Sequence, residues 1–270
     1  MHIEAILRQF PIGEVASVEA LPLSYSHLSY RIKTVSGASF FVKQYNKDVQ
    51  AFVKAEKEIQ VWRLAAKKGL APQLIHVDAT YRFVVAEFIE AQLYQGGVQH
   101  QALLSTTLRQ FHQLGASLNG TVLSLTETLM TYQAKLDPQR KHVCAQNEVM
   151  QRAYHAAKQL EAASLPLGLC HMDLYTDHML FTHDQCYLID FEYAQKSYRV
   201  LDFASLGLDD PSFLDAALIQ DLSDDEVMSL DNAKIYLWGL SWFWYQYMYQ
   251  VRGDERFLQQ AEGVYRKMTT

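Results

Sequence analysis

Two short stretches indicate the fold and chemistry of this chain: residues 171–178 read HMDLYTDH, and residues 187–192 read YLIDFE. The apolar residues 187–189 predict a short buried strand that ends at an acidic side chain, Asp190. A second carboxylate, Asp173, lies upstream in a stretch whose composition indicates a loop. The pattern is therefore a buried strand that ends near one aspartate, with a second aspartate in a loop upstream.

Phosphoryl transfer needs such a pair, because one carboxylate orients the attacking hydroxyl and accepts its proton while another holds the metal ion that neutralises the phosphates. We expect Asp173 to be the catalytic base. We expect Asp190 and Glu192 to hold Mg²⁺, since residues i and i+2 of an extended segment point the same way and Mg²⁺ prefers oxygen ligands. The alternative is a strand end with solvated acids, which the preceding apolar run disfavours.

The spacing of these residues resembles the H-x-D-x-x-x-x-N and D-x-E motifs of the choline kinase and aminoglycoside phosphotransferase superfamily. The resemblance implies that His171 braces the catalytic loop. One position departs from the motif, because His178 stands where that family has an Asn that helps to hold the metal. Imidazole is a poor ligand for Mg²⁺, so His178 either turns away from the metal site or ligates and favours Mn²⁺.

The resemblance covers nearly the whole chain and implies an α+β, protein-kinase-like fold with two lobes. We expect residues 1–90 to form a β-rich nucleotide-binding lobe with one long helix, and residues 91–270 a mostly helical catalytic and substrate-binding lobe. Residue patterns predict strands at 29–35, 39–44, 74–78 and 81–87, with a hairpin turn at Ser36 and Gly37. They predict helices at 52–68, 103–118, 123–134, 139–163 and 224–270.

Lys43 is the single cation of the apolar run FFVK, residues 40–43. The resemblance implies that Lys43 contacts the phosphates of ATP and that Glu58, on the following helix, pairs with it. Glu56 is the alternative partner, but it should face elsewhere on that helix. A surface lysine is the plain alternative for Lys43.

The expected phosphate loop reads LSYSHLSY, residues 23–30, and contains no glycine. The family usually has glycines here, which let backbone N–H groups approach phosphates. Serine hydroxyls remain as candidates, and Ser26 is the one that we expect to bind the nucleotide.

Residues Glu87, Phe88 and Ile89 resemble the hinge whose backbone binds adenine; an ordinary edge strand is the alternative. Asp202 resembles an aspartate that supports the catalytic loop, and we expect its role to be structural.

The composition is that of a globular protein, with 49% apolar and 20% charged residues. Three cysteines without CxxC spacing predict reduced thiols, and the start of the chain has no secretion signal pattern, so we expect a cytoplasmic location. The apolar run near residues 235–249 is too short and interrupted for a membrane span.

Charge is unevenly distributed along the chain. Residues 171–232 contain 14 acidic and 2 basic residues, a balance of −12, although the whole chain has a net charge of −6. Such a segment attracts cations and repels nucleic acid, so metal ions and a cationic substrate are the expected partners. For residues 221–226 a solvated acidic loop is the favoured alternative.

The C-terminal segment is rich in aromatic residues, and Trp238, Trp242 and Tyr245 would share one helix face. Aromatic faces bind organic cations with roughly 0.5–2 kcal/mol each, although burial within a core explains most of these rings as well. Residues 241–266 resemble bacterial thiamine kinases, as do residues 171–173 together with 189–194, whereas residues 58–72 are closer to bacterial choline kinases.

Together these features predict an ATP- and Mg²⁺-dependent phosphotransferase acting on the hydroxyl of a small cationic alcohol. Thiamine is the first candidate and choline or ethanolamine the second. The alternatives are a catalytically degenerate relative that binds a nucleotide or cation without turnover, and an aminoglycoside-type phosphotransferase.

Overall fold

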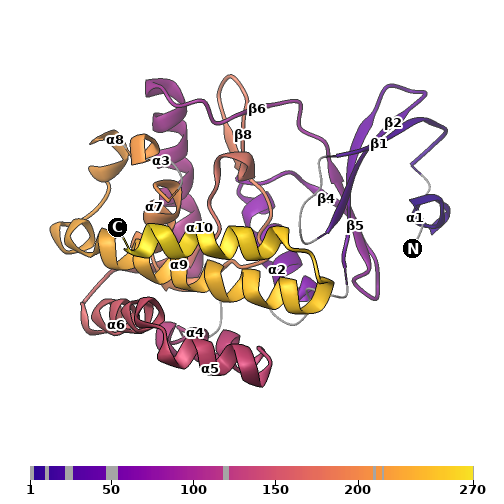
Figure 1. The fold of residues 1–270 in the computed structure, drawn as a ribbon. Coiled ribbons are helices and arrows are strands. Elements are labelled where there is room, and N and C mark those ends of the chain that lie inside the picture. Colours follow the sequence, from indigo (N-terminus) through magenta and orange to yellow (C-terminus); the bar gives the residue numbers. More distant parts are fainter. Residues whose placement is uncertain are drawn as a thin grey trace. The chain divides into compact units, whose positions relative to one another are not determined.

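The computed structural model describes residues 3–9, 12–21, 27–46, 54–117, 122–208, 211–214 and 216–269. The chain forms two compact units (Figure 1). The first consists of Met1–Tyr94 and Asp177–Tyr193, and the second of Gln95–Thr176 and Ala194–Thr270. The sequence did not predict that residues 177–193 would belong to the first unit. The division into domains at residue 90 stays a prediction.

The first unit contains a five-stranded antiparallel sheet with the order β1-β2-β3-β5-β4. Its strands are β1 (Val15–Ala20), β2 (Leu28–Thr34), β3 (Ser39–Gln44), β4 (Leu74–Val77) and β5 (Phe83–Glu87). The predicted hairpin is present, because β2 and β3 pair antiparallel around the turn, in which Gly37 has a φ of 89°. Glycine adopts such a positive φ without the steric cost that other residues incur.

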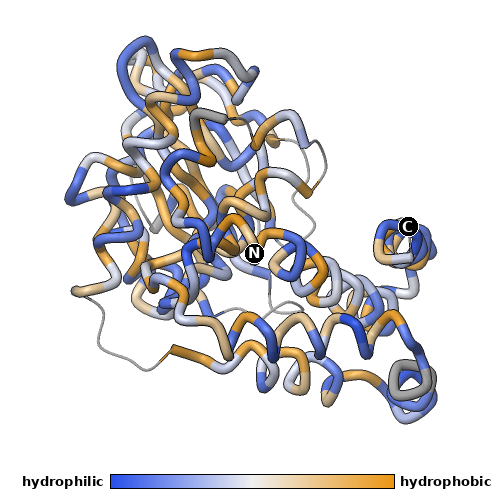
Figure 2. Tube along the Cα trace, turned by 90° about the vertical axis from the view of Figure 1, so that its left-hand side faces the viewer, coloured by the Kyte–Doolittle hydropathy of each residue, from blue (hydrophilic) through white to orange (hydrophobic). Residues whose placement is uncertain are grey.

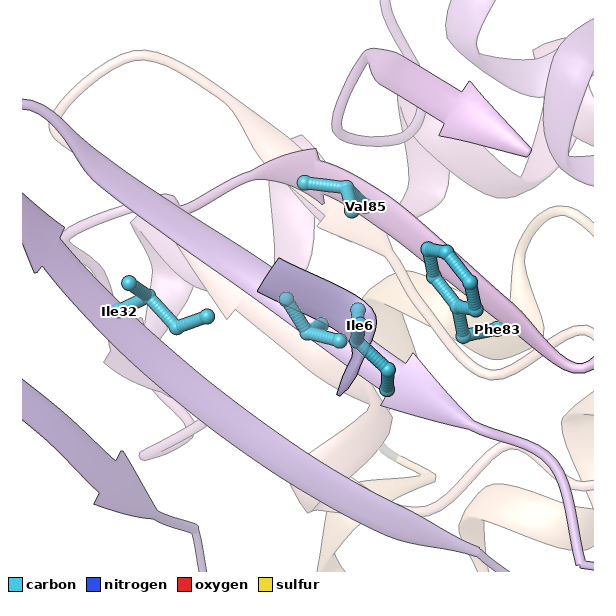
Figure 3. Packing of buried hydrophobic residues seen from close by; sticks show 5 residues of the cluster. Ile6, Ile32, Phe83 and Val85 are labelled. Atoms are coloured by element: carbon cyan, nitrogen blue, oxygen red, sulfur yellow. The ribbon is translucent and has the colours of Figure 1, made fainter. Parts of the chain in front are cut away.

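One face of this sheet packs against helix α1 (Ile3–Gln9). The core consists of Ile6 from α1 together with Ile32, Val42, Phe83 and Val85 from the central strands (Figure 3). Burying such a side chain stabilises the fold by about 1.5–3 kcal/mol. This core fixes the alternation along β3: Val42 faces α1, so its neighbour Lys43 faces the opposite side of the sheet.

Helix α2 (Ala55–Lys67) lies within the residues predicted to be helical. Its buried residues include Ile59, Trp62 and Ala65, the spacing expected of one apolar face. The helix ends at Lys67 with Lys68 as its C-cap, and Gly69, which follows, has a φ of 73°. The N–H groups of Gly69 and Leu70 return to the carbonyls of Ala66 and Ala65, which is the Schellman arrangement of a helix end.

A second, three-stranded sheet completes the first unit, with the order β6-β8-β9. Its strands are β6 (Gln92–Leu93), β8 (Met179–Phe181) and β9 (Cys186–Leu188), and the short 3₁₀ helix η3 (Thr176–His178) precedes β8. The N–H of Leu188 donates to the carbonyl of Leu70 at 2.8 Å. This bond ties the end of β9 to the end of α2.

The second unit is mostly helical. Its longer helices are α3 (Val98–Gln113), α4 (Leu125–Ala134), α5 (Pro138–Gln146), α6 (Glu148–Ala162), α9 (Asp224–Arg252) and α10 (Arg256–Thr269). The shorter segments are η2 (Leu114–Ser117), α7 (Val200–Leu206), η4 (Pro211–Phe213) and α8 (Ala216–Ile219). Strands β7 (Leu167–Cys170) and β10 (Gln195–Tyr198) pair antiparallel. Helix α9 packs against α6, α7 and α10, and hydrophilic and hydrophobic residues alternate around helical turns (Figure 2).

Two expected helices are each divided in the structure. The helix predicted over residues 139–163 breaks at Asn147, whose side chain accepts the N–H of Val149 and caps α6. The helix predicted over residues 224–270 breaks at Gly253, which adopts the left-handed conformation with a φ of 67°. In both cases the apolar spacing continues through the position, but a residue that favours a helix end divides the helix in two.

The prediction of a solvated acidic loop at residues 221–226 was wrong for Glu226, which is fully buried. Its carboxylate accepts the N–H of Ser223 at 3.0 Å and lies 2.8 Å from the Arg199 guanidinium. The Ser223 hydroxyl in turn caps the first turn of α9, so the two residues form a capping box.

Among the helices of the described ranges, none combines the length and apolar character that crossing a bilayer requires.

Candidate functional site

The first unit holds a buried cluster of charges around Lys43. The Lys43 Nζ lies 2.7 Å from Glu58 Oε1, 2.7 Å from Asp190 Oδ1 and 3.9 Å from Glu192 Oε2. The side chains of Lys43, Glu58 and Glu192 are at most 5% exposed, whereas that of Asp190 is 20% exposed. One ammonium group therefore contacts three carboxylates.

The fold explains why these residues meet. Lys43 is the last but one residue of β3, paired with Ser29 of β2 and Val84 of β5, and it points away from the apolar core. Glu58 lies on the buried face of α2, whereas Glu56 is exposed, so Glu58 is the helix residue that contacts Lys43. Asp190 follows β9, whose end is tied to the end of α2.

The charges in this cluster shift one another's pKa values. Burial disfavours the ammonium form of Lys43, but the carboxylates of Asp190, Glu58 and Glu192 outweigh burial and raise its pKa well above the usual value. Burial also disfavours the charged form of Asp190, yet Lys43 and His178 lower its pKa below the usual value. Burial raises the pKa of Glu58, and Lys43 opposes that change. Lys43 is therefore a cation and Asp190 an anion at neutral pH.

The segment of Asp190 and Glu192 is not extended, so the prediction that strand geometry brings their carboxylates together was wrong. Strand β9 ends at Leu188, and Asp190 has a φ of 65°, in the left-handed region. Positions i and i+2 therefore do not follow strand alternation here. The two carboxylates come together because both approach Lys43.

His178 lies beside Asp190 through the hairpin of β8 and β9. Its backbone carbonyl accepts the N–H of Ile189 at 3.1 Å. Its Nε2 lies 3.9 Å from Asp190 Oδ2, whereas Lys43 contacts Oδ1. His178 thus does not turn away from Asp190, although a role in holding a metal stays a prediction.

The residues present fit a hard divalent cation. Asp190 and Glu192 offer carboxylate oxygens from positions two apart in the chain, and the Asp190 side chain is partly accessible. Oxygen donors of this kind suit Mg²⁺.

The sequence interpretation missed a second histidine at this cluster. His27 is buried, and its Nε2 lies 2.8 Å from Glu192 Oε2. Its Nδ1 accepts the backbone N–H of Asn46 at 3.1 Å. His27 belongs to the expected phosphate loop, but no sequence motif links a histidine at this position to Glu192. Ser26, predicted to bind the nucleotide, lies outside the described residues.

The residues of the expected hinge follow the end of β5. Glu87 is the last residue of that strand and is exposed, and Phe88 and Ile89 are half-buried. The guanidinium of Arg31 lies 4.2 Å from the centre of the Phe88 ring. Binding of adenine by this segment stays a prediction.

In the second unit, the loop that carries Asp173 is held by helix α7. The N–H groups of His171 and Met172 donate to Asp202 Oδ2 and Oδ1, each at 2.9 Å. One helical turn later, Ser205 Oγ accepts the N–H of Leu174 at 3.0 Å. Asp202 therefore supports the loop from a fully buried position, which agrees with its expected structural role.

Further contacts fix the same loop. Met172 has a φ of 68°, and the His171 ring is fully buried 6.4 Å from the Phe111 ring. The buried His112 Nε2 lies 2.9 Å from Asp202 Oδ2, a contact that the sequence interpretation missed. Asp173 itself is half-buried. The backbone on both sides of Asp173 is thus constrained, as a positioned base requires.

The predicted substrate residues Trp238, Trp242 and Tyr245 all lie on α9, but they differ in their surroundings. Trp242 lines a cavity of about 570 Å³ together with Glu262 and Tyr265 of α10. The remaining lining residues are Asn147, Gln246, Leu258 and Gln259. Trp238 and Tyr245 are half-buried and are not among the described residues that line this cavity. Of these three predicted substrate residues, Trp242 alone lines this cavity.

A family model described as the phosphotransferase enzyme family (APH) matches residues 17–230. No curated protein sequence matches the chain.

Several solved structures match over nearly the full length. Choline kinase LicA from Streptococcus pneumoniae has a TM-score of 0.81 at 20% identity, covering 100% of this chain and 99% of LicA. An ethanolamine kinase from Plasmodium vivax has a TM-score of 0.75 at 17% identity, covering 100% and 87%. A choline/ethanolamine kinase family protein from Mesorhizobium loti has a TM-score of 0.74 at 21% identity, covering 99% and 92%. These matches confirm the predicted protein-kinase-like α+β fold.

Two further matches are nucleotide complexes. LicA was also solved with AMP, with a TM-score of 0.79 at 20% identity and coverage of 99% and 96%. The amicoumacin kinase hAmiN was solved with AMP-PNP, Ca²⁺ and Ami, with a TM-score of 0.65 at 12% identity and coverage of 99% and 93%.

Proposed function

The chain belongs to the phosphotransferase enzyme family and is a small-molecule phosphotransferase, and on that premise we propose that it transfers the γ-phosphoryl group of ATP to the hydroxyl of a small cationic alcohol. Residues 1–90 would be the nucleotide-binding lobe and residues 91–270 the catalytic and substrate-binding lobe. Cys170 and Cys186 are buried and are not in a disulfide, which supports a reducing compartment and hence the cytoplasm as the proposed location.

The observation that carries this proposal is the buried Lys43, held at 2.7 Å by both Glu58 and Asp190. A lysine fixed in this way offers a localised positive charge to the phosphates, and Glu58 keeps the side chain in place when Asp190 takes a metal. Asp190 and Glu192 would hold Mg²⁺. When bound, this ion neutralises the negative charge of the phosphates.

Asp173 would orient the acceptor hydroxyl and accept its proton. Its loop is prepared for that role, because Asp202 and Ser205 hold three backbone N–H groups around it. A base that is already oriented avoids the entropic cost of positioning it during the reaction. In the reaction, the alcohol oxygen would form a bond to the γ-phosphorus as the bond from that phosphorus to the β-γ bridging oxygen breaks; ADP would leave, and the hydroxyl proton would pass to Asp173.

The nucleotide complexes of LicA and hAmiN support a nucleoside triphosphate as the phosphoryl donor. In this chain the adenine would meet the backbone of residues 87–89. The choice of Mg²⁺ rests on the carboxylate ligands of the site.

Charge and aromatic residues favour a cationic acceptor. Residues 171–232 have a balance of −12, and Trp242 and Tyr265 line one cavity with the carboxylate of Glu262. Two rings and a carboxylate are suitable contacts for an organic cation. The similarity to structures of choline and ethanolamine kinases supports the same class of acceptor. We propose thiamine first and choline or ethanolamine second, since the sequence after residue 241 resembles thiamine kinases.

A thermal-shift screen followed by product detection tests this proposal. Thiamine, choline, ethanolamine, an aminoglycoside and neutral sugars are each added with and without Mg·ATP, and ³¹P NMR then identifies any phosphorylated product. We expect one of the small cations to raise the melting temperature and to yield a phosphate ester with release of ADP. ATP binding without any product would instead support the catalytically degenerate alternative, and an aminoglycoside product would support the third one.

A further inference from the structure

His27, the buried partner of Glu192, has no assigned role in the reaction. Their side chains are 2% and 4% exposed, and His27 Nε2 lies 2.8 Å from Glu192 Oε2. The same carboxylate oxygen lies 3.9 Å from Lys43 Nζ. The Glu192 carboxylate is thus approached by an imidazole and an ammonium in a buried environment, where charges need such partners.

The backbone determines which nitrogen of His27 carries the proton. The N–H of Asn46 donates to Nδ1 at 3.1 Å, so Nδ1 presents a lone pair. A neutral imidazole has one N–H and one lone pair, which puts the proton on Nε2, the nitrogen next to Glu192. The edge of the Tyr45 ring, 5.1 Å away between centroids, packs against the imidazole and restricts its rotation.

This tautomer argues against His27 as a metal ligand. Ligand atoms of His27, Glu58 and Glu192 lie within 4.8 Å of one another, a grouping compatible with a bound metal. A ligating Nε2 would have to offer a lone pair while Nδ1 offers another to Asn46, which a neutral imidazole cannot do. Lys43 Nζ already contacts Glu58 at 2.7 Å. The role that remains for Nε2 is a polar contact with the Glu192 carboxylate.

We propose that His27 is a positioning residue that orients the Glu192 carboxylate for metal binding. The inference rests on the proposed function, in which Glu192 is a metal ligand. A polar contact of 2.8 Å with one carboxylate oxygen limits rotation of the group before the metal arrives, so less freedom is lost on binding. Such outer contacts to ligating side chains affect metal affinity strongly, because they set the direction of the ligand's lone pairs.

The test measures metal binding directly. Electron paramagnetic resonance reports the dissociation constant of Mn²⁺ in the presence of AMP-PNP for each variant. His27→Phe keeps a ring but removes the donor, and we expect it to weaken Mn²⁺ binding by about tenfold to a hundredfold. His27→Gln places an amide N–H near the position of Nε2, and we expect it to bind Mn²⁺ within about threefold of wild type. His76→Phe changes a histidine of the same unit that packs against Phe83 and should bind as wild type.

The Glu192→Gln variant separates failure of this inference from failure of the proposed function. If Glu192→Gln binds Mn²⁺ as wild type, the metal role of Glu192 in the proposed function is wrong. If Glu192→Gln weakens binding but His27→Phe does not, the inference about His27 alone is overturned. A His27→Gln variant as weak as His27→Phe also contradicts a donor role. In the double variant, His27→Phe should add no further loss to Glu192→Gln, because His27 acts through that carboxylate.

Discussion

Two single residues, Met172 in the second unit and Asp190 in the first, have left-handed backbones with φ values of 68° and 65°. This conformation costs roughly 1–2 kcal/mol for a residue other than glycine, and such strain is found at functional sites when surrounding contacts enforce it. The N–H of Met172 donates to Asp202, and the Asp190 carboxylate is held by Lys43. These contacts offset the strain and place the side chains that we assign to catalysis.

Substitutions of His178 and Asp190 test which of these residues holds the metal. His178 Nε2 lies 3.9 Å from Asp190 Oδ2, and imidazole is a weak ligand for Mg²⁺ but a better one for softer metals. We expect His178→Asn to keep or raise activity with Mg²⁺, and Asp190→Ala to abolish activity. Rates of wild type and both variants are compared with Mg²⁺ and with Mn²⁺. Loss of activity of His178→Asn with both metals would show a direct role for His178 that this account lacks.

The aromatic residues of α9 give a second test. Trp242 lines the cavity with Tyr265 and Glu262, whereas Trp238 does not. If the cation binds against the Trp242 ring, Trp242→Ala should weaken binding of thiamine or choline by roughly 1–2 kcal/mol, and Trp238→Ala serves as the comparison on the same helix. Isothermal titration calorimetry provides the affinities. Equal binding of a neutral sugar and both cations would remove the basis for a cation site.

Helices α6 and α9 pack closely, and Gly239 makes this possible. A Cβ at Gly239 would lie 2.5 Å from the Cβ of Ala153, closer than two carbon atoms can approach. Gly239→Ala should therefore destabilise the protein by about 1–3 kcal/mol. At Gly263 of α10, by contrast, no described heavy atom lies within 4 Å of such a Cβ.

Gly263→Ala is thus the matched control, and it should stabilise the protein by about 0.5–1 kcal/mol because alanine favours helix. Urea denaturation gives both free energies of unfolding. A Gly239→Ala variant as stable as wild type would contradict the described packing of α6 on α9.

The turn between β4 and β5 gives a prediction about pH. Asp78 accepts hydrogen bonds from the Arg82 side chain, from the Thr80 hydroxyl and from backbone N–H groups, and chiefly the Arg82 bonds lower its pKa below the usual value. A lowered folded-state pKa means that the carboxylate adds stability above its unfolded pKa, about 3.9, and that this stability is lost as the pH falls toward the folded pKa.

Asp78→Asn should accordingly be less stable than wild type by about 1–2 kcal/mol at pH 7, and the difference should shrink below about pH 4. Urea denaturation of both proteins across pH 3–7 checks this expectation. A difference that stays constant with pH would mean that the charge of Asp78 contributes nothing.

The elements that the sequence predicted well are those with a strong local pattern. Strand β3 has the predicted bounds, and α2 ends just before the predicted Gly69, because apolar spacing and a glycine stop signal act locally. Strand β1 was missed because it is almost entirely exposed and has no apolar alternation. The contacts of His27 with Glu192 and of His112 with Asp202 join residues far apart in the chain, and no local pattern reports such pairs.

The molecule as a whole joins two units with different contributions to the reaction that we propose. The first unit holds Lys43, Glu58, Asp190 and Glu192, the residues that we assign to ATP and the metal. The second holds Asp173 and the aromatic residues of α9, which we assign to the acceptor. This division predicts that a change in the second unit impairs transfer without impairing nucleotide binding.

Replacement of Asp173 tests that prediction most directly. The measurement is the steady-state rate of phosphoryl transfer from ATP to thiamine and to choline for wild type and Asp173→Ala, together with the affinity of each protein for ATP. We predict that wild type phosphorylates one of the two cations, and that Asp173→Ala lowers kcat by about a hundredfold or more with nearly unchanged ATP affinity. Transfer by Asp173→Ala at the wild-type rate would contradict the assignment of Asp173 as the base.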